Sequence, residues 1–206
     1  MGTLHVLEHP LAAHIITHLR DERTKPITFR TLTYQISLLL ALEATRDLGV
    51  RPREIATPLE ACTGEVLGAS LAVVPILRAG IGMVQPFTDL FPDVSVGYVG
   101  LERDHKTAIA RNYYCKLPPL EGKRVFIVDP MLATGGSATQ AIDVLKRKGA
   151  DNVTLVCIVS APEGARAVWA AHGDVEIFTA AHDRCLNARK YILPGLGDFG
   201  DRLYGT

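Results

Sequence analysis

The sequence has few cysteines, and none of them lies near another. Its 206 residues include four, at Cys62, Cys115, Cys157 and Cys185. This spacing matches neither a zinc knuckle nor a redox pair. We therefore expect four reduced thiols, with Cys157 in the core of a strand.

The sequence also lacks an excess of charge and any long apolar run. Lys and Arg number 22, as do Asp and Glu, so the formal net charge is zero. Nucleic-acid binders usually carry a basic excess, so we expect no nucleic-acid partner, although a local basic pocket could still hold a small anion. Apolar runs such as Ser70–Leu77 are too short to span a membrane. The N-terminus does not resemble a signal peptide. We therefore expect a cytoplasmic protein without membrane contact.

What the sequence does contain is enough apolar residues for one globular domain. Hydrophobic residues make up 48% and charged residues 21%, proportions typical of a folded protein. A length of 206 residues suits one domain, which we expect to span residues 1–206.

The pattern of apolar residues predicts helices first and then alternating strands and helices. Residues 1–50 read as helical, with a helix over Leu32–Leu48 that stops at Gly49. Thr57–Leu67 reads as irregular because Pro58 and Gly64 interrupt it. Strands are predicted at Leu71–Leu77, Val94–Val99, Asn112–Leu117, Arg124–Val128, Val153–Val159 and Val175–Thr179, and helices at Ser137–Lys148 and Pro162–His172. This order predicts an α/β fold with parallel strands covered on both faces.

The loop Asp129–Ser137 is the strongest candidate for a ligand site. It joins a buried strand to a helix, and ligands of open α/β sheets bind at the carboxyl ends of strands. The helix N-terminus offers unpaired N–H groups to a phosphate. Gly135 and Gly136 would let the backbone approach it closely, Thr134 and Ser137 add hydroxyl donors, and Asp129 could accept hydrogen bonds from ribose hydroxyls.

Other interpretations of this loop fit the sequence less well. A plain strand–helix turn with Ser137 as the N-cap would be preferred for Thr-Gly-Gly-Ser alone, and the strand and Asp129 before it argue against that. A Walker loop needs a lysine beside the glycines, and there is none. The dinucleotide fingerprint is absent here as well.

The segment D-P-M-L-A-T-G-G-S at Asp129–Ser137 resembles the motif with which type I phosphoribosyltransferases bind 5-phospho-α-D-ribose 1-diphosphate (PRPP). Pro130 stands where most of that family has a second acidic residue, and this departure is similar to the uracil-specific branch. The resemblance covers essentially the whole chain, with matching segments at His9–Leu11, Glu43–Asp47, Ile76–Gly80 and Tyr191–Arg202.

The resemblance implies a fold and an activity. The fold would be a mainly parallel twisted sheet flanked by helices, with a small hood formed by the termini and a flexible β-hairpin loop at Glu102–Arg111. Its PRPP-binding core would span about 66–185 and its base-binding segment about 186–206. The reaction would convert uracil and PRPP to UMP and diphosphate in pyrimidine salvage. Mg²⁺ would be held by PRPP oxygens, GTP is a possible activator, and a homodimer or higher homo-oligomer is expected.

The resemblance also implies roles for individual residues. The catalytic set would be Arg78, Arg103 and Asp198. PRPP would contact these three and the loop residues Asp129, Pro130, Met131, Leu132, Ala133, Thr134, Gly135, Gly136 and Ser137. Uracil would contact Ile192, Gly197, Asp198 and Phe199, largely through backbone groups. Asp198 could also reach Mg²⁺ through water.

Each of these roles has a plainer alternative. Arg78 could be a surface arginine in a turn, Arg103 could belong to a solvated run of charges, and the glycine-rich tail could be a disordered terminus. After Asp104 the sequence departs from the more acidic form typical of the family, which leaves the details of loop closure open.

Two further groups of residues could suggest a site, and two other functions remain possible from the sequence. His14 and His18 share a helix face without an apparent third metal ligand, so they read as structural. His182, Asp183 and Cys185 could suggest a nucleophilic site, but nothing in the sequence orders them. The rival functions are a regulator that binds PRPP or UMP and controls transcription or RNA, and an enzyme for another base such as orotate or a purine.

Overall fold

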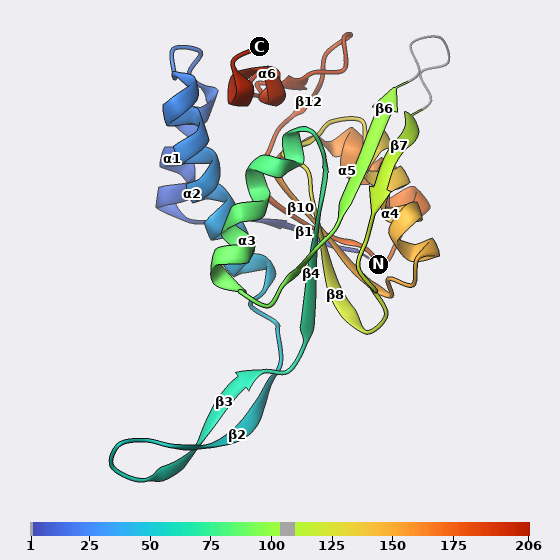
Figure 1. Cartoon of the computed structure of the whole chain (residues 1–206). Helices are drawn as coiled ribbons and strands as arrows, with labels where there is room; N and C mark the ends of the chain where they lie inside the picture. Colours follow the sequence, from blue (N-terminus) through green and yellow to red (C-terminus); the bar gives the residue numbers. More distant parts are fainter. Residues whose placement is uncertain (1, 104–109) are drawn as a thin grey trace.

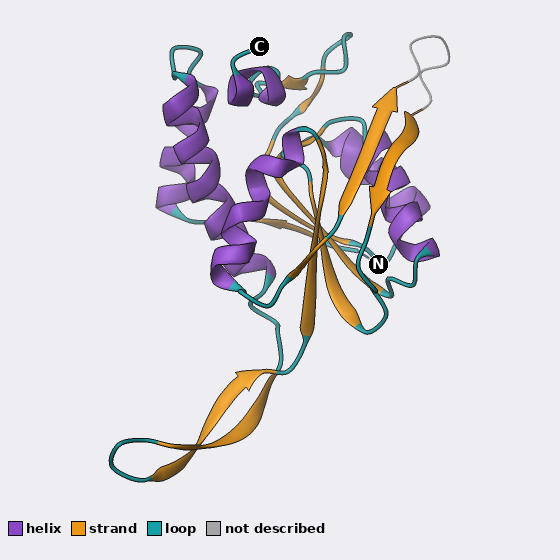
Figure 2. Ribbon diagram, in the orientation of Figure 1, coloured by secondary structure: helices purple, strands orange, loops and turns teal. Residues whose placement is uncertain are grey.

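The computed structural model describes residues 2–103 and 110–206, and for residues 102, 103 and 110–113 it describes the backbone alone. Within these residues a nine-stranded sheet forms the centre of the molecule (Figures 1 and 2). Its strands are β1 (Leu4–Val6), β4 (Ser70–Leu77), β5 (Ser95–Val96), β6 (Tyr98–Arg103), β7 (Ala110–Lys116), β8 (Lys123–Val128), β9 (Met131–Leu132), β10 (Asn152–Ser160) and β11 (Glu176–His182). The strand order is β1-β11-β10-β8-β4-β6-β7, with β5 paired to β4 and β9 to β10.

Most of these strands are parallel, and the described exception is the antiparallel pair β6–β7. The helices are α1 (Pro10–Arg20), α2 (Pro26–Ala44), α3 (Val84–Leu90), α4 (Gly136–Arg147), α5 (Pro162–Ala171) and α6 (Phe199–Tyr204), and a 3₁₀ turn, η1 (Ala79–Met83), precedes α3. None of the helices among the described residues is both long and apolar enough to cross a membrane.

Helices cover both faces of the sheet. Helices α1, α2 and α3 lie on one side, and α4 and α5 lie on the other (Figure 1). The central strand β8 shows why, because Phe126 and Val128 belong to one apolar core and Val125 and Ile127 to the other, all with no exposed surface. Successive side chains of a strand point to opposite faces, so a strand that is apolar at every position needs both layers of helices.

The parallel strands β4, β8 and β10 end at the same edge of the sheet. The segments that follow them are η1, the loop from Asp129 to Gly135, and the start of α5. The C-terminal segment, with β12 (Cys185–Leu186), β13 (Ile192–Leu193) and α6, lies over this edge (Figure 1). The fold therefore brings the Arg78 turn, the loop after β8 and the C-terminal segment, for which functions were predicted, to one end of the molecule.

The predicted fold class is confirmed, and several predictions of local structure are wrong. Thr57–Leu67 is not irregular: β2 (Val50–Ala56) and β3 (Ala61–Leu67) pair from Val50↔Leu67 to Ala56↔Ala61 as a long hairpin that leaves the domain (Figure 1). Every residue of β2 is exposed, and β3 alternates only between exposed and half-buried residues, so no buried apolar face marked either strand. The helix predicted to Leu48 ends at Ala44.

The N-terminus and the 102–111 segment also differ from expectation. Residues 4–6 form β1, a parallel partner of β11, where only helix was predicted. Glu102 and Arg103 lie in β6, and Ala110 and Arg111 lie in β7, so the ends of the predicted loop are strands. Residues 104–109, at its centre, lie outside the described residues.

Candidate active site

The loop after β8 is held in place by β10. The backbone N–H groups of Ile158 and Val159 both donate to the carbonyl oxygen of Pro130, at 3.0 Å each, and Ala161 N–H donates to Leu132 O at 3.0 Å. Asp129 and the residues from Met131 to Ala138 then line one hollow at the edge of the sheet. Pro130 does not line it, because it is buried beneath the loop.

Helix α4 opens onto this hollow with its N-terminus uncovered. Its N-cap is Gly135, and among the described residues no side chain caps it. Ser137 lies inside the first turn, so the alternative reading of Ser137 as the N-cap is wrong. The first N–H groups of a helix have no partner within it and carry partial positive charge, so this end of α4 is suited to an anion.

The two glycines of the loop differ in their surroundings. Gly135 has φ = +80°, and a Cβ there would lie 2.7 Å from the carbonyl oxygen of Gly164 in α5. A Cβ on Gly136 would meet nothing closer than the hydroxyl of Thr134 at 3.8 Å. Both glycines were expected to let the backbone approach a phosphate. The lack of a side chain at Gly135 instead makes room for α5, whereas the lack of one at Gly136 leaves open space.

The carboxyl group of Asp129 stands at the base of the hollow. It is half-buried, and loss of hydration raises its pKa to about 7. A hydrogen bond from Met131 N–H favours the charged form and lowers the pKa by less. Near neutral pH the group is therefore present in both protonation states. The ionised form accepts hydrogen bonds from two hydroxyls or faces a cation.

The turn after β4 is packed against the end of β8. Arg78 follows β4 across a cis peptide bond, and a Cβ on Gly80 would lie 2.5 Å from the carbonyl oxygen of Val128. Gly80 thus allows the Arg78 turn to lie directly beside the residue that precedes Asp129. The Arg78 side chain is exposed.

The C-terminal segment is folded, so the alternative of a disordered tail is wrong. Ile192 is 4% exposed and Phe199 is 2% exposed, and the Phe199 ring packs edge-on against Phe29 with 5.1 Å between centroids. Only the backbone of these two residues is left to contact a base. Gly197 and Asp198 are exposed, and the Asp198 carboxylate accepts a hydrogen bond from Asp201 N–H at 3.0 Å, which caps α6.

Helix α6 joins the tail to the Arg78 turn. The Tyr204 hydroxyl donates to the carbonyl oxygen of Arg78 at 3.2 Å, and a Cβ on Gly82 would lie 2.9 Å from the Leu203 side chain. Next to this helix, residues 194–198 line a cavity of about 500 Å³ together with Arg20, Glu22, Asp201 and Arg202. The structure therefore brings together the Asp129 loop, the Arg78 turn and the tail.

Other predicted residues are not brought into this arrangement. The backbone of Arg103 lies in β6, paired with Ala110, and its side chain lies outside the described residues. Asp183 forms an ion pair with Arg20 at 2.6 Å, while His182 contacts the Ser160 hydroxyl at 2.8 Å. The possible nucleophilic cluster of His182, Asp183 and Cys185 is therefore not assembled.

No group of three or more His, Cys, Asp or Glu side chains in residues 2–103 and 110–206 is placed to hold a metal ion. The rings of His14 and His18 lie edge to face, 4.6 Å apart. Sequence reasoning missed the roles of Arg20, Asp183 and Tyr204, for which no local pattern stands out. Arg202 ends the recognised segment Tyr191–Arg202, but its partners could not be read from it.

Comparison with known proteins gives consistent results. A family model described as uracil phosphoribosyltransferase matches residues 6–206. Uracil phosphoribosyltransferases of Levilactobacillus brevis and Bacillus cereus are 50% and 51% identical to this chain over 208 residues, with 100% of both chains covered in each case.

Two solved structures show the same fold. The AQ2163 protein of Aquifex aeolicus superposes with a TM-score of 0.94 at 35% identity, covering 99% of each chain. A hypoxanthine-guanine phosphoribosyltransferase of Bacillus anthracis superposes with a TM-score of 0.53 at 13% identity, covering 74% of this chain and 78% of that one. The second likeness concerns the fold alone.

Proposed function

The chain belongs to the uracil phosphoribosyltransferase family, a family of pentosyltransferases that form UMP and diphosphate from uracil and PRPP, and we propose how its residues carry out this reaction. The observation that supports the assignment of roles is the convergence of three segments. Gly80 packs the Arg78 turn against Val128, next to Asp129, and Tyr204 joins the tail to Arg78. One substrate can therefore span all three.

The 5-phosphate of PRPP binds at the N-terminus of α4. The open space over Gly136 lets the phosphate reach the backbone N–H groups, and the hydroxyls of Thr134 and Ser137 add donors. Asp129, at the other side of the hollow, accepts hydrogen bonds from the ribose hydroxyls. The anomeric carbon is then held in a fixed position, which lowers the barrier by orientation.

The pyrophosphate leaves toward Arg78. The Arg78 side chain is exposed, and its turn packs against Val128, next to Asp129. From this turn the guanidinium stabilises negative charge that grows as the bond to the anomeric carbon breaks. The ribose passes through an oxocarbenium-like state. Arg103, by the family resemblance, contributes a second positive charge.

Mg²⁺ fits this site as a partner of PRPP. Asp129 is the one acidic side chain of the described residues that lines the hollow. Mg²⁺ usually keeps waters and binds through substrate phosphates with one or two carboxylates. Asp129, and Asp198 through water, are the residues that would face it. When bound, Mg²⁺ would neutralise charge on the leaving diphosphate.

The tail recognises uracil through its backbone. Uracil presents a ring N–H between two carbonyl oxygens, and the exposed backbone at Gly197 and Asp198, with backbone groups of Ile192 and Phe199, can match this edge. A backbone N–H aimed at O4 would reject cytosine, whose amino group is a donor and would leave a polar group unpaired.

The experiment that tests this proposal is a measurement of UMP formation from uracil, PRPP and Mg²⁺. Cytosine, orotate and hypoxanthine serve as competing bases. We expect uracil to be converted to UMP and the other three bases not to be converted to their nucleotides. A well-folded preparation that makes no UMP, or that prefers another base, would contradict the assignment.

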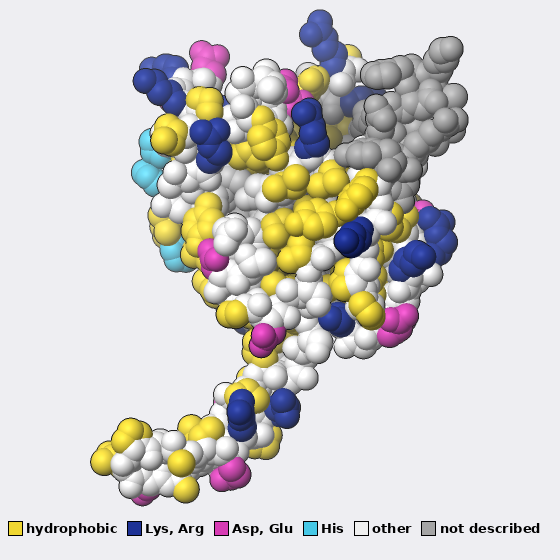
Figure 3. All heavy atoms as spheres, viewed as in Figure 1, with side chains coloured by type: hydrophobic (Ala, Val, Ile, Leu, Met, Phe, Trp, Pro, Cys, Tyr) yellow, Lys and Arg dark blue, Asp and Glu magenta, His cyan; other side chains and the backbone are white. Residues whose placement is uncertain are grey.

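The hairpin of β2 and β3 supports the expected homo-oligomer. Large apolar side chains are exposed along it and at its ends, at Val50, Ile55, Leu59 and Leu67, and hydrophobic side chains are visible on its surface (Figure 3). Exposed apolar groups on an extended arm favour contact with another chain. We propose a second copy of this chain as the partner. GTP activation and a cytoplasmic location stay predictions from the family resemblance and the sequence.

A further inference from the structure

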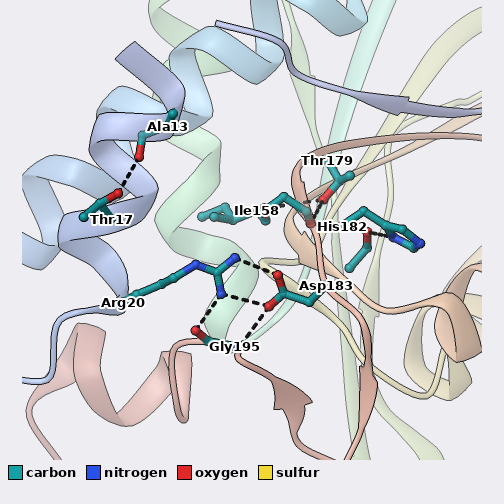
Figure 4. A network of polar contacts seen from close by, with 10 residues as sticks. Ala13, Thr17, Arg20, Ile158, Thr179, His182, Asp183 and Gly195 are labelled. Carbon is teal, nitrogen blue, oxygen red and sulfur yellow. Dashed lines mark hydrogen bonds and ion pairs between the residues drawn. The ribbon is translucent and has the colours of Figure 1, made fainter. Parts of the chain in front are cut away.

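An ion pair lies directly behind the segment that we propose as the base site. Arg20 is the last residue of α1, and Asp183 follows β11. Arg20 Nη2 donates to Asp183 Oδ1 at 2.6 Å, and Nη1 donates to Oδ2 at 2.8 Å (Figure 4). Two parallel hydrogen bonds between a guanidinium and a carboxylate fix both direction and distance.

The same ion pair holds both polar groups of Gly195. Arg20 Nη1 donates to the Gly195 carbonyl oxygen at 2.8 Å, and Gly195 N–H donates to Asp183 Oδ2 at 2.8 Å (Figure 4). Gly195 has φ = +61°, and a Cβ there would lie 2.2 Å from Ile192 O. No side chain fits at this turn, so it can be held only through its backbone.

The charges of the pair are matched. Asp183 is 7% exposed, and burial by itself would raise its pKa, but the Arg20 guanidinium and Gly195 N–H keep the pKa of this carboxyl below its ordinary value. Asp183 is therefore ionised at neutral pH. An ion pair of this kind stabilises a fold little more than apolar residues of the same size would, but only this pair can hold both polar groups of the Gly195 backbone.

Arg202 holds the next residue of the tail. Its Nη1 donates to the carbonyl oxygen of Leu196 at 2.8 Å and also to Leu19 O, and its Nη2 donates to Asp21 O at 2.6 Å. Arg20 thus reaches from α1 to the tail, and Arg202 reaches from the tail to the end of α1. The backbone is held at Gly195 and Leu196, immediately before the exposed Gly197 and Asp198.

We infer that Arg20 and Asp183 are positioning residues for the base site: they hold the backbone of residues 195–198 in the geometry that binds uracil. The inference rests on the proposed role of the tail. Backbone groups recognise a base only when their direction is fixed, and the exposed Gly197 and Asp198 cannot fix it by themselves. Affinity for uracil therefore depends on helix α1, which lies far away in the sequence.

The test is a steady-state comparison of Asp183→Asn and Arg20→Lys with the unchanged protein. Asp183→Asn keeps the shape of the side chain but loses its charge, and we expect the KM for uracil to rise about tenfold or more, while the KM for PRPP stays within about twofold. Arg20→Lys keeps the charge without the paired geometry, and we expect a smaller rise. In both variants discrimination against cytosine should weaken.

The matched control is the surface ion pair of Lys146 and Asp174, with 2.6 Å between Nζ and Oδ1. Asp174→Asn should leave both KM values unchanged. A purely structural role for Arg20 and Asp183 predicts less folded protein with an unchanged KM for uracil, and that result in Asp183→Asn would overturn the inference. If Asp183→Asn does not fold, the same measurement on Arg20→Lys decides.

The two levels of the proposal can fail separately. An unchanged protein that makes no UMP would contradict the proposed function. An unchanged protein that makes UMP, together with an Asp183→Asn variant of normal KM for uracil, would contradict the positioning role alone.

Discussion

The hydroxyl of Tyr204, in the C-terminal helix, donates a hydrogen bond to the backbone carbonyl oxygen of Arg78 at 3.2 Å. The two residues are 126 positions apart in the sequence, and each belongs to a segment with its own proposed role. Leu203 packs beside Gly82 in the same contact. The base segment and the leaving-group turn are thereby joined, so the positions of the two reacting groups are set together.

Asp129→Asn should weaken the use of PRPP while the fold is kept. A carboxylate that accepts hydrogen bonds from ribose hydroxyls is worth about 1.5–3 kcal/mol, so kcat/KM for PRPP should fall roughly tenfold to a hundredfold. The measurement is initial rate against PRPP at saturating uracil. Asp174→Asn, at a surface ion pair, is the control, and equal kinetics in the two variants would refute the ribose role.

The raised pKa of Asp129 also predicts a pH dependence of stability without ligand. The folded chain holds this proton up to about pH 7, whereas the unfolded chain releases it near pH 4. The stabilising contribution is therefore complete below about pH 4 and is lost as pH rises to 7.

Asp129→Asn should remove that loss. We compare the free energy of unfolding in urea of Asp129→Asn with that of the unchanged protein. This difference should grow in favour of the variant by roughly 1–3 kcal/mol between pH 4.5 and pH 7.5. Parallel pH curves for the two proteins would show that Asp129 titrates normally in the folded state.

The two glycines of the loop should respond differently to the same substitution. Gly135→Ala places a methyl group against Gly164 O in a backbone conformation that alanine disfavours, and we expect a loss of about 2–4 kcal/mol in unfolding free energy. Gly136→Ala adds a methyl group in open space at a helical position, so stability should change by less than about 1 kcal/mol.

Gly136→Ala should instead raise the KM for PRPP by about tenfold or more, because the methyl group keeps the phosphate from the backbone. Thermal or urea unfolding and PRPP kinetics of both variants distinguish the two roles. A normal KM for PRPP in Gly136→Ala would place the phosphate elsewhere.

Arg78→Gln should reduce catalysis without affecting the fold. The side chain is exposed, so the unfolding free energy should change by at most about 0.5 kcal/mol. Loss of the charge that stabilises the leaving diphosphate should lower kcat by about 10²–10³-fold. Arg147→Gln, at the far end of α4, is the control. If both variants lower kcat only slightly, Arg78 is a surface arginine without a role in catalysis.

The hairpin arm gives a prediction about assembly. Replacement of Ile55 and Leu59, which are 45% and 94% exposed, by Ser should leave the domain folded because neither side chain is in its core. We expect weaker self-association in sedimentation velocity at micromolar concentration. Glu65→Gln, at an exposed polar residue of β3 on the same arm, is the control. If the unchanged protein and the Ile55/Leu59 double variant are both monomers, the arm has another use.

The sequence by itself determined the parallel core and the strand–loop–helix unit that contains Asp129–Ser137. Strands β4, β8 and β10 and helices α4 and α5 begin and end within a few residues of their predicted bounds, because apolar runs, turn residues and helix stops are local signals. The loop Asp129–Ser137 was found for the same reason, since strand, Asp, glycines and helix follow one another directly.

Only the tertiary structure decided how the segments combine. The pairing of β1 with β11 and of Arg20 with Asp183, 163 positions apart, depends on contacts that no local pattern encodes. In the hairpin, β2 is exposed at every position and β3 alternates only between exposed and half-buried residues, so neither strand has a buried apolar face to mark it. Even the two adjacent glycines were alike in the sequence, and only the approach of α5 to Gly135 separated a residue required by packing from one left open to a phosphate.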